Sequence, residues 1–463
     1  MDQLKQTAVD WVNSEAETIT GLAEEQWERP QLPMCEEYAA TALSEWLEDE
    51  GFEVELGVSN METAFVAEYA VGDGGPTVGF IAEYDALADL SNVSEPVKEP
   101  LEEDAPGHGC GHNLIGTGNI AAAIAVKEAL VESGTDGTVR VYGSPGEELL
   151  ISNVFMTRDG LFEGDDMVLT SHPKGRNPTA STQSSLALIS TEFVFHGQSC
   201  HTPSSPEEGR HALDAAVQLI NGANALDKHM DQDTIIEYVI TEGGYQPNVV
   251  PSISKVWFFI RNPDVEKARE SYEKIRSAAE GAATATDTEL EEAFITGCHP
   301  YLMNDTITET IYENAVDLGG PSYSEEEREL AQELLDEYEI EADEPIKEEV
   351  KLEKGGLTLA SQDDGDTSWV VPMGRLQYPY PTDVPLHTWG ATVASGSSLG
   401  QTGMLFNAKT LACTAIDAIA DPELLAAIED EFETATVDYE YECLAPEDVE
   451  PIDGDWVQER LGE

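Results

Sequence analysis

Three short runs of apolar, largely β-branched residues constrain the fold of this chain most strongly. They cover residues 77–82, 137–142 and 166–170, and a helix-like or glycine-rich stretch separates each run from the next. Continuous apolar runs of this length are typical of strands buried on both faces of a sheet. The alanine-rich segment 119–132 can form a covering helix between the first two runs. The pattern predicts an α/β catalytic domain with a wound, mixed sheet.

The sequence pattern changes after about residue 185. Apolar and polar residues alternate with a period of two in three segments, 185–197, 233–244 and 254–263. Such alternation is typical of half-buried strands, and two further segments have helical character, 210–230 and 265–279. We therefore expect a smaller α+β lid and dimerisation domain at 186–297.

The lid would divide the catalytic domain into two parts, at 1–185 and 298–463. The second part contains a charge-dense stretch at 322–353. We expect this stretch to be a solvated surface insertion whose first half forms an exposed acidic helix.

Charge excludes several kinds of partner. The chain carries 92 acidic and 23 basic residues, a formal net charge of −69 at pH 7. Such a charge repels polyphosphate, so we expect neither nucleic acid nor a membrane surface as a partner. The same acidity is typical of adaptation to high salt, because salt screens self-repulsion. The chain has no recognisable secretion signal and its six cysteines are sparse, which indicates a cytoplasmic protein in a high-salt cytosol.

The first motif with chemical potential is GHGCGHNLIG at residues 107–116. It places Cys110 and His112 two residues apart in a glycine-rich loop that opens the alanine-rich helix. A thiolate and an imidazole held this close can ligate one metal ion or a pair. A buried structural cysteine in a glycine-rich turn is the alternative interpretation.

Further candidates follow the other two apolar runs. Glu147 and Glu148 stand side by side in SPGEELL, and His172 follows the third run in TSHP. His387 in PLHTW lies far along the chain. At a strand end, one carboxylate can ligate metal while its neighbour accepts a proton from water. Adjacent acids are otherwise common as solvated charges, and a lone histidine is often a partly buried residue without catalytic function.

Seven motifs appear in order across nearly the whole chain. They are AEYDAL at 82–87, GHGCGHNLIG, SPGEE, HTPSSPEEGRHALDAA from 201, GGYQPNVVP from 243, DDGDTSWVVP from 363 and LHTWGATVASGSSLGQTGM from 386. Together they resemble the dinuclear metallopeptidase and amidohydrolase superfamily of carboxypeptidase G, aminoacylase and the indole-acetyl-amino-acid hydrolases. The branch with the greatest likeness is that of the aminobenzoyl-glutamate hydrolases.

The resemblance implies a role for each matching residue. It implies two divalent metal ions, Zn or Mn with Co as a further candidate, held by Cys110, His112, Glu148, His172 and His387. Glu147 would be the general base, and His201 in the lid would reach into the active site of the partner chain in a homodimer. Asn248 and Arg261 would grip the substrate carboxylate, and the glycines around Gly396 would form a backbone wall of the site.

The chain departs from the superfamily pattern in two places. Glu83 and Asp85 stand where the peptidase branches carry a ligand histidine two residues before an aspartate, which implies a cysteine-type ligand set. Asn113 stands where many amidohydrolases have aspartate, as in the aminobenzoyl-glutamate branch. The expected reaction is hydrolysis of an amide in a small molecule that bears a free carboxylate, such as an N-acyl amino acid or aminobenzoyl-glutamate, with dipeptidase or carboxypeptidase activity as the alternative.

Two different classes of function compete with this expectation. GSSLG at 396–400 matches the nucleophile elbow of serine hydrolases, but no histidine follows His387 to complete a triad around Ser398 in the order which that fold requires. A metal-dependent binding protein without turnover is the other alternative. The presence of Glu147 argues against it, since a purely structural site does not need a spare carboxylate.

Overall fold

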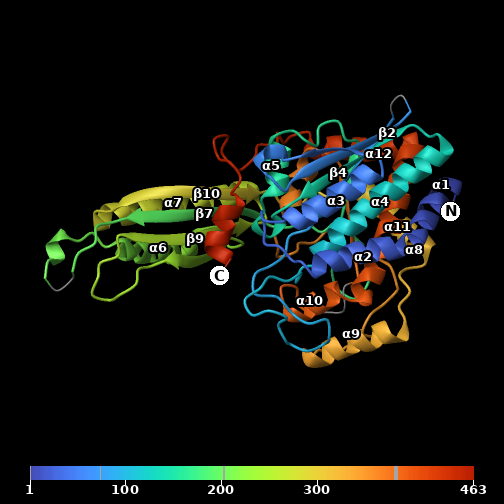
Figure 1. The fold of residues 1–463 in the computed structure, drawn as a ribbon. Helices are drawn as coiled ribbons and strands as arrows, with labels where there is room; N and C mark the ends of the chain where they lie inside the picture. Colours follow the sequence, from blue (N-terminus) through green and yellow to red (C-terminus); the bar gives the residue numbers. More distant parts are fainter. Residues whose placement is uncertain (1, 73–74, 202–203, 380–383, 463) are drawn as a thin grey trace.

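The computed structural model describes residues 2–72, 75–201, 204–379 and 384–462, which form a large lobe and a smaller, elongated lobe (Figure 1). An eight-stranded sheet forms the centre of the large lobe, and a separate four-stranded sheet forms the small one. Helices accompany both sheets. The predicted class, an α/β catalytic domain with an α+β lid, is confirmed.

The large sheet is mixed, with parallel strands at its centre. Its order is β1-β2-β4-β3-β5-β12-β6-β11. Neighbours from β4 through β3 and β5 to β12 run parallel, whereas β1–β2, β2–β4 and β12–β6 are antiparallel. The three predicted apolar runs are confirmed as β3, β4 and β5. The bounds are β1 Glu53–Leu56, β2 Phe65–Val71, β3 Thr77–Glu83, β4 Gly137–Ser144, β5 Met167–Pro173, β6 Thr179–Ser181, β11 Lys351–Glu353 and β12 Met373–Tyr378.

Two long helices, α4 and α11, lie in the main apolar core of this lobe beside the sheet. Among the described residues, α4 is the one helix long and apolar enough to cross a membrane, and 89% of its apolar window is buried inside the protein. The bounds are α1 Gln3–Ser14, α2 Ala16–Trp27, α3 Glu37–Asp49, α4 His112–Ser133, α5 Ser152–Arg158, α8 Asp305–Leu318, α9 Glu325–Glu337, α10 Trp389–Ser395, α11 Ser398–Ala420, α12 Pro422–Thr436 and α13 Gly454–Leu461.

The small lobe is an antiparallel sheet in the order β10-β7-β9-β8, packed against two helices. Alternate residues of β9 are buried, as the period of two predicted. The bounds are β7 Ala187–His196, β8 Ile235–Glu242, β9 Ile253–Asn262, β10 Glu289–Cys298, α6 Ala212–Leu226 and α7 Val265–Thr286. The domain limits at 186 and 297 stay predictions.

The acidic stretch 322–353 contains the predicted helix, α9, which begins with a capping box between Ser324 and Glu327. One face of α9 is not solvated, because Leu334 is buried together with Val384 and Val393. Apolar residues at helical spacing within an acidic sequence explain how this insertion packs onto the catalytic lobe.

Candidate active site

Parallel pairing brings three polar strand ends to one edge of the large sheet. β3 ends at Glu83, whose register partner in β4 is Ser144, and β5 ends just after His172. Glu147 and Glu148 follow β4 in a short helical turn. Ligand sites in open α/β sheets lie at this carboxyl edge.

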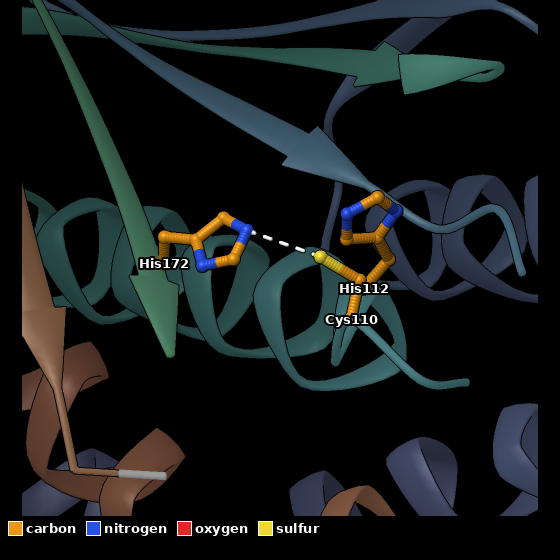
Figure 2. A group of neighbouring side chains, drawn as sticks. All are labelled: Cys110, His112 and His172. Atoms are coloured by element: carbon orange, nitrogen blue, oxygen red, sulfur yellow. Dashed lines mark hydrogen bonds between the residues drawn. The ribbon is translucent and has the colours of Figure 1, made fainter. Parts of the chain in front are cut away.

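All five predicted metal ligands gather there. The Cys110 thiol lies 3.3 Å from His172 Nε2, beside the His112 ring at the start of α4 (Figure 2). Cys110, His112 and His172 offer ligand atoms within 4.8 Å of one another, and so do Cys110, Glu148 and His387. Cys110 belongs to both groups, which places it where a shared ligand between two metal ions would have to lie.

His387 reaches this edge from a distant part of the sequence. Its backbone N–H donates to the Gly109 carbonyl at 2.9 Å, which ties the PLHTW segment to the GHGCGH loop. Its φ is +60°, a conformation uncommon for a residue with a side chain. Its Nε2 lies 3.4 Å from a carboxylate oxygen of Glu148, and 53% of its side chain is exposed. His387 is therefore the solvent-facing member of the cluster.

Two carboxylates that the sequence did not assign to the site surround His112. Asp85 Oδ1 lies 2.8 Å from His112 Nδ1, and Asp85 Oδ2 accepts from the Glu148 backbone N–H at 3.0 Å. Glu83 Oε2 lies 3.6 Å from His112 Nε2, on the same side as Glu147 Oε2 at 3.5 Å. Because 27 residues separate Asp85 from His112, only the fold reveals this pair.

The donor set fits divalent cations. Glu83 Oε2, His112 Nε2 and Glu148 Oε1 are buried and, among the described residues, have no hydrogen-bond partner. Buried polar atoms are rarely left unpaired, so three such atoms together indicate a ligand at this point. Thiolate, imidazole and carboxylate are the donors that Zn, Mn and Co share.

Burial shapes the electrostatics of the cluster. It raises the pKa of Glu147, with a further contribution from Glu83, and it raises the pKa of the Cys110 thiol. Burial opposes the charged form of His112, but Asp85 and Cys110 beside it raise its pKa well above the ordinary value. The protein alone therefore holds these groups protonated, and cation binding would be coupled to proton release because ligands must be deprotonated.

Two glycines allow the backbone geometry of the site. Gly146 has φ +66°, and its N–H donates to the buried Glu36 carboxylate at 2.8 Å, which fixes the turn before Glu147. At Gly116 in α4, a Cβ would lie 2.5 Å from the Glu83 carbonyl oxygen. The absence of a side chain there lets α4 approach β3 closely enough to bring His112 beside Glu83.

The cluster opens into a cleft of about 570 Å³ between the lobes. The cleft is lined by Cys110, Glu147, Glu148, His172 and His387 from the large lobe, and by Arg261 on β9 of the lid. Such a volume suits a small organic ligand.

Three other candidates do not line this cleft. His201 and Asn248 are exposed on neighbouring loops of the lid, where His201 pairs with Val249 in a short bridge. Thr202 and Pro203 of the same motif lie outside the described residues. Gly396 lies in the turn between α10 and α11, where a Cβ would be 2.2 Å from the Trp27 ring.

Asn113 does not join the metal-binding cluster. Its side-chain amide donates to the carbonyls of Ala23 and Ser395, both at 3.1 Å, and so it ties the start of α4 to α2 and α10. The substitution of asparagine for aspartate at this position therefore serves packing of the helix end, with no direct contact to the ligand atoms.

The fold and the donor set together define a two-domain metallohydrolase. Residues 184–287 match the peptidase dimerisation domain of the M20 family. The chain is 33% identical to a p-aminobenzoyl-glutamate hydrolase polypeptide from Escherichia coli, across 97% of this chain and 99% of that protein. It is 29% identical to Xaa-Arg dipeptidase from Mus musculus, across 93% of each.

Solved structures share the architecture. A dinuclear metal-binding M20 peptidase from Bacillus subtilis aligns with a TM-score of 0.58 at 18% identity, covering 88% of this chain and 99% of that one. An aminobenzoyl-glutamate utilization protein from Klebsiella pneumoniae aligns with a TM-score of 0.60 at 14% identity, covering 85% and 97%. The chain belongs to the M20 family of metallopeptidases and amidohydrolases. It is a metal-dependent enzyme that hydrolyses amide bonds.

Proposed function

We propose that the enzyme cleaves the amide bond between an acyl group and an amino acid with a free carboxylate, and that p-aminobenzoyl-glutamate is the first substrate to test. One observation carries this proposal. Five metal-type donors and the separate carboxylate of Glu147 converge on one cleft large enough for such a molecule. A relative of full length hydrolyses p-aminobenzoyl-glutamate according to its name, while the dipeptidase relatives make a dipeptide the second candidate.

In this proposal the residues divide into ligands and a base. Cys110, His112, Glu148, His172 and His387 hold two divalent ions, Zn or Mn with Co as a further candidate. The ions supply Lewis acidity, which lowers the pKa of bound water from about 15.7 toward 7. Glu147 accepts the proton of the attacking water and hands it to the leaving amine nitrogen. Its position at the cleft, beside the ligands and without a protein cation bonded to it, suits this task.

Arg261 orients the substrate by its carboxylate. Its guanidinium lines the cleft, donating to Glu237 at 2.9 Å and to Ser361 of the large lobe at 2.9 Å. A planar fork of donors matches a carboxylate in geometry. Replacing the contact to Ser361 by one to the substrate would connect substrate binding to the position of the lid.

Metal-dependent turnover tests the function directly. We expect purified protein in high salt to release free amino acid from p-aminobenzoyl-glutamate or another N-acyl amino acid, to stop after chelation, and to recover with Zn, Mn or Co. Cys110→Ala should lose both metal and activity. Cys413→Ala is the matched control, because Cys413 is buried in α11 within the main core. Full activity of metal-free protein would refute the proposed site.

We also propose that the active unit is a homodimer completed in trans. His201 and Asn248 resemble catalytic lid residues of the family, yet neither lines the cleft of its own chain. β8 is an edge strand of the lid sheet, and its Tyr238, Val239 and Ile240 are exposed, as expected of a pairing surface.

Mixing of inactive variants tests this arrangement. His201→Ala and Glu147→Gln proteins, after random exchange of chains, should form mixed dimers with one intact site each. Half of the dimers would be mixed, so activity should approach about one quarter of wild type by two-fold symmetry. Proven exchange without recovery would place His201 in the site of its own chain or outside catalysis.

The acidic surface supports a further proposal, that the enzyme functions in a high-salt cytosol. Screening should offset the self-repulsion of 69 excess negative charges. The melting temperature should rise markedly between about 0.1 M and 3 M KCl, over which screening changes strongly. An unchanged melting temperature would contradict the proposal.

A further inference from the structure

The cleft has a charge balance unlike that of the whole molecule. The chain has four acidic residues for each basic one, yet the cleft is lined by three of each: Glu147, Glu148 and Glu237 against Lys174, Arg261 and Arg375. Two of the three carboxylates belong to the catalytic cluster. Basic side chains retained against such a background indicate a cleft built for an anionic ligand.

Arg375 is a buried guanidinium at the floor of the cleft. It lies on β12, is 7% exposed, and donates to the Tyr301 hydroxyl at 2.8 Å. The Tyr301 hydroxyl donates in turn to Asp364 at 2.5 Å, so the guanidinium is held on a rigid support. Arg375 Nε has no hydrogen-bond partner among the described residues. A buried, partly unpaired guanidinium is rare, because the cost of leaving a charged donor unpaired is high.

Strand register sets Arg375 beside the metal ligands. β12 pairs with β5 in parallel, with Gln377 opposite His172 and Arg375 opposite Thr170. Residues two apart on a strand share a face, and so His172, Gln377 and Arg375 lie along one wall of the cleft.

Lys174 extends the same wall just beyond β5. Its backbone N–H donates to the Tyr378 carbonyl, and its Nζ lies 3.4 Å from the Thr358 hydroxyl. No carboxylate lies within ion-pair distance of Lys174 among the described residues, in a chain where most basic side chains have an acidic partner.

We infer that Lys174 and Arg375 bind a second carboxylate of the substrate, the side-chain carboxylate of an acidic amino acid on the leaving side of the amide. This assignment rests on the proposed amide hydrolysis and narrows its substrate class to N-acyl glutamate or aspartate. Arg261 is left to the carboxylate next to the scissile bond, on the opposite, lid side of the cleft. A basic leaving residue would place like charges together, which disfavours dipeptides that end in arginine or lysine.

A purely structural role is the competing explanation for Arg375. The guanidinium also lies near Asp364 and Glu83, whose buried charges it offsets. A residue with only that role would affect every substrate equally, whereas a specificity residue changes the ratio between a charged substrate and its neutral isostere. Lys174 has no comparable buried carboxylate to balance.

The test compares p-aminobenzoyl-glutamate with p-aminobenzoyl-glutamine, which differ only in the charge of the distal group. In the metal-loaded enzyme at high KCl, kcat/KM should favour the glutamate conjugate by about 10- to 100-fold, as expected for a charge-assisted contact. Lys174→Met should lower kcat/KM for the glutamate conjugate by about 10-fold and leave the glutamine conjugate unchanged. Arg375→Met should act in the same direction, and Arg375→Lys should retain part of the preference. Lys98→Met, which removes an exposed charge away from the cleft lining, is the matched control and should leave the ratio unchanged.

Calorimetry on the Glu147→Gln enzyme separates binding from turnover, since both conjugates can be titrated without hydrolysis. Lys174→Met in that background should erase the difference in affinity between the two conjugates. Equal affinity of both conjugates for Glu147→Gln, or an equal loss for both on Lys174→Met, would overturn the assignment even if Arg375→Met fails to fold. Absence of turnover for every conjugate with metals bound would instead refute the proposed function while the binding comparison still decides the second-carboxylate site.

Discussion

Asp85→Asn tests how the protein sets the position of two metal ligands with one carboxylate. Oδ1 of Asp85 lies 2.8 Å from His112 Nδ1, and Oδ2 accepts from the Glu148 N–H at 3.0 Å. Asparagine has one acceptor oxygen, so one of these N–H groups would face an amide NH₂ instead. The loss of one charge-assisted hydrogen bond in a buried site is worth about 1.5–3 kcal/mol. At about 1.4 kcal/mol for each factor of ten, that range corresponds to roughly a 10- to 100-fold loss of metal affinity, the size typical of groups that orient metal ligands.

Competition of the apoprotein with a chelator for Zn measures this affinity, and kcat/KM at saturating metal measures the catalytic consequence. Asp421→Asn is the matched control: Asp421 caps α12 by accepting from the N–H groups of Glu423 and Leu424, and asparagine is an equally good cap. The control should leave Zn affinity unchanged. An affinity of Asp85→Asn within about threefold of wild type would refute the argument that Asp85 orients His112 and Glu148.

Three further predictions follow from the same geometry. Glu147→Gln should keep its metals but lose at least about 100-fold in rate, whereas Glu148→Gln should lose metal; equal metal loss would show that the pair has been divided wrongly. Gly116→Ala should lower the free energy of unfolding by about 1–3 kcal/mol, because its Cβ would meet a backbone oxygen that cannot rotate away; an unchanged denaturation midpoint would count against it. Burial raises the pKa of Asp165 to about 7, so its protonated form favours the fold and that stability is lost as pH rises through 7. Asp165→Asn should therefore lose less stability than wild type between pH 5 and 8, and parallel pH profiles would contradict this.

The sequence predicted the elements whose local pattern is unambiguous. β3, β4 and β5 are continuous apolar runs, and β7 and β9 alternate cleanly, so periodicity alone locates them. β10 was not predicted, because its first half is acidic and only pairing with β7 makes it a strand. β12 was missed for a similar reason: a short strand with a central arginine shows no apolar run, and its place between β5 and β6 depends on long-range pairing.

The candidate site divides in the same way. The spacing within GHGCGH and SPGEE identified Cys110 and the adjacent glutamates, because those groups are close in sequence as well as in space. Asp85 and Arg375 act through neighbours that the fold supplies, His112 for one and the wall of the cleft for the other. No local pattern distinguishes such residues from the many other charged positions of an acidic chain.

The acidity of the surface and the acidity of the site place separate demands on cations. Repulsion between exposed carboxylates extends through solvent, so it weakens as KCl shortens the Debye length to about 3 Å at 1 M. Glu83, Asp85 and Glu147 are buried beside His112, where solvent ions do not enter and screening is weak. Arg375 offsets part of that charge, but burial still raises the pKa of Glu83 and Glu147. Concentrated KCl can therefore stabilise the surface without replacing the divalent ions at the sheet edge, since only a cation ligated by the buried donors can hold those carboxylates ionised.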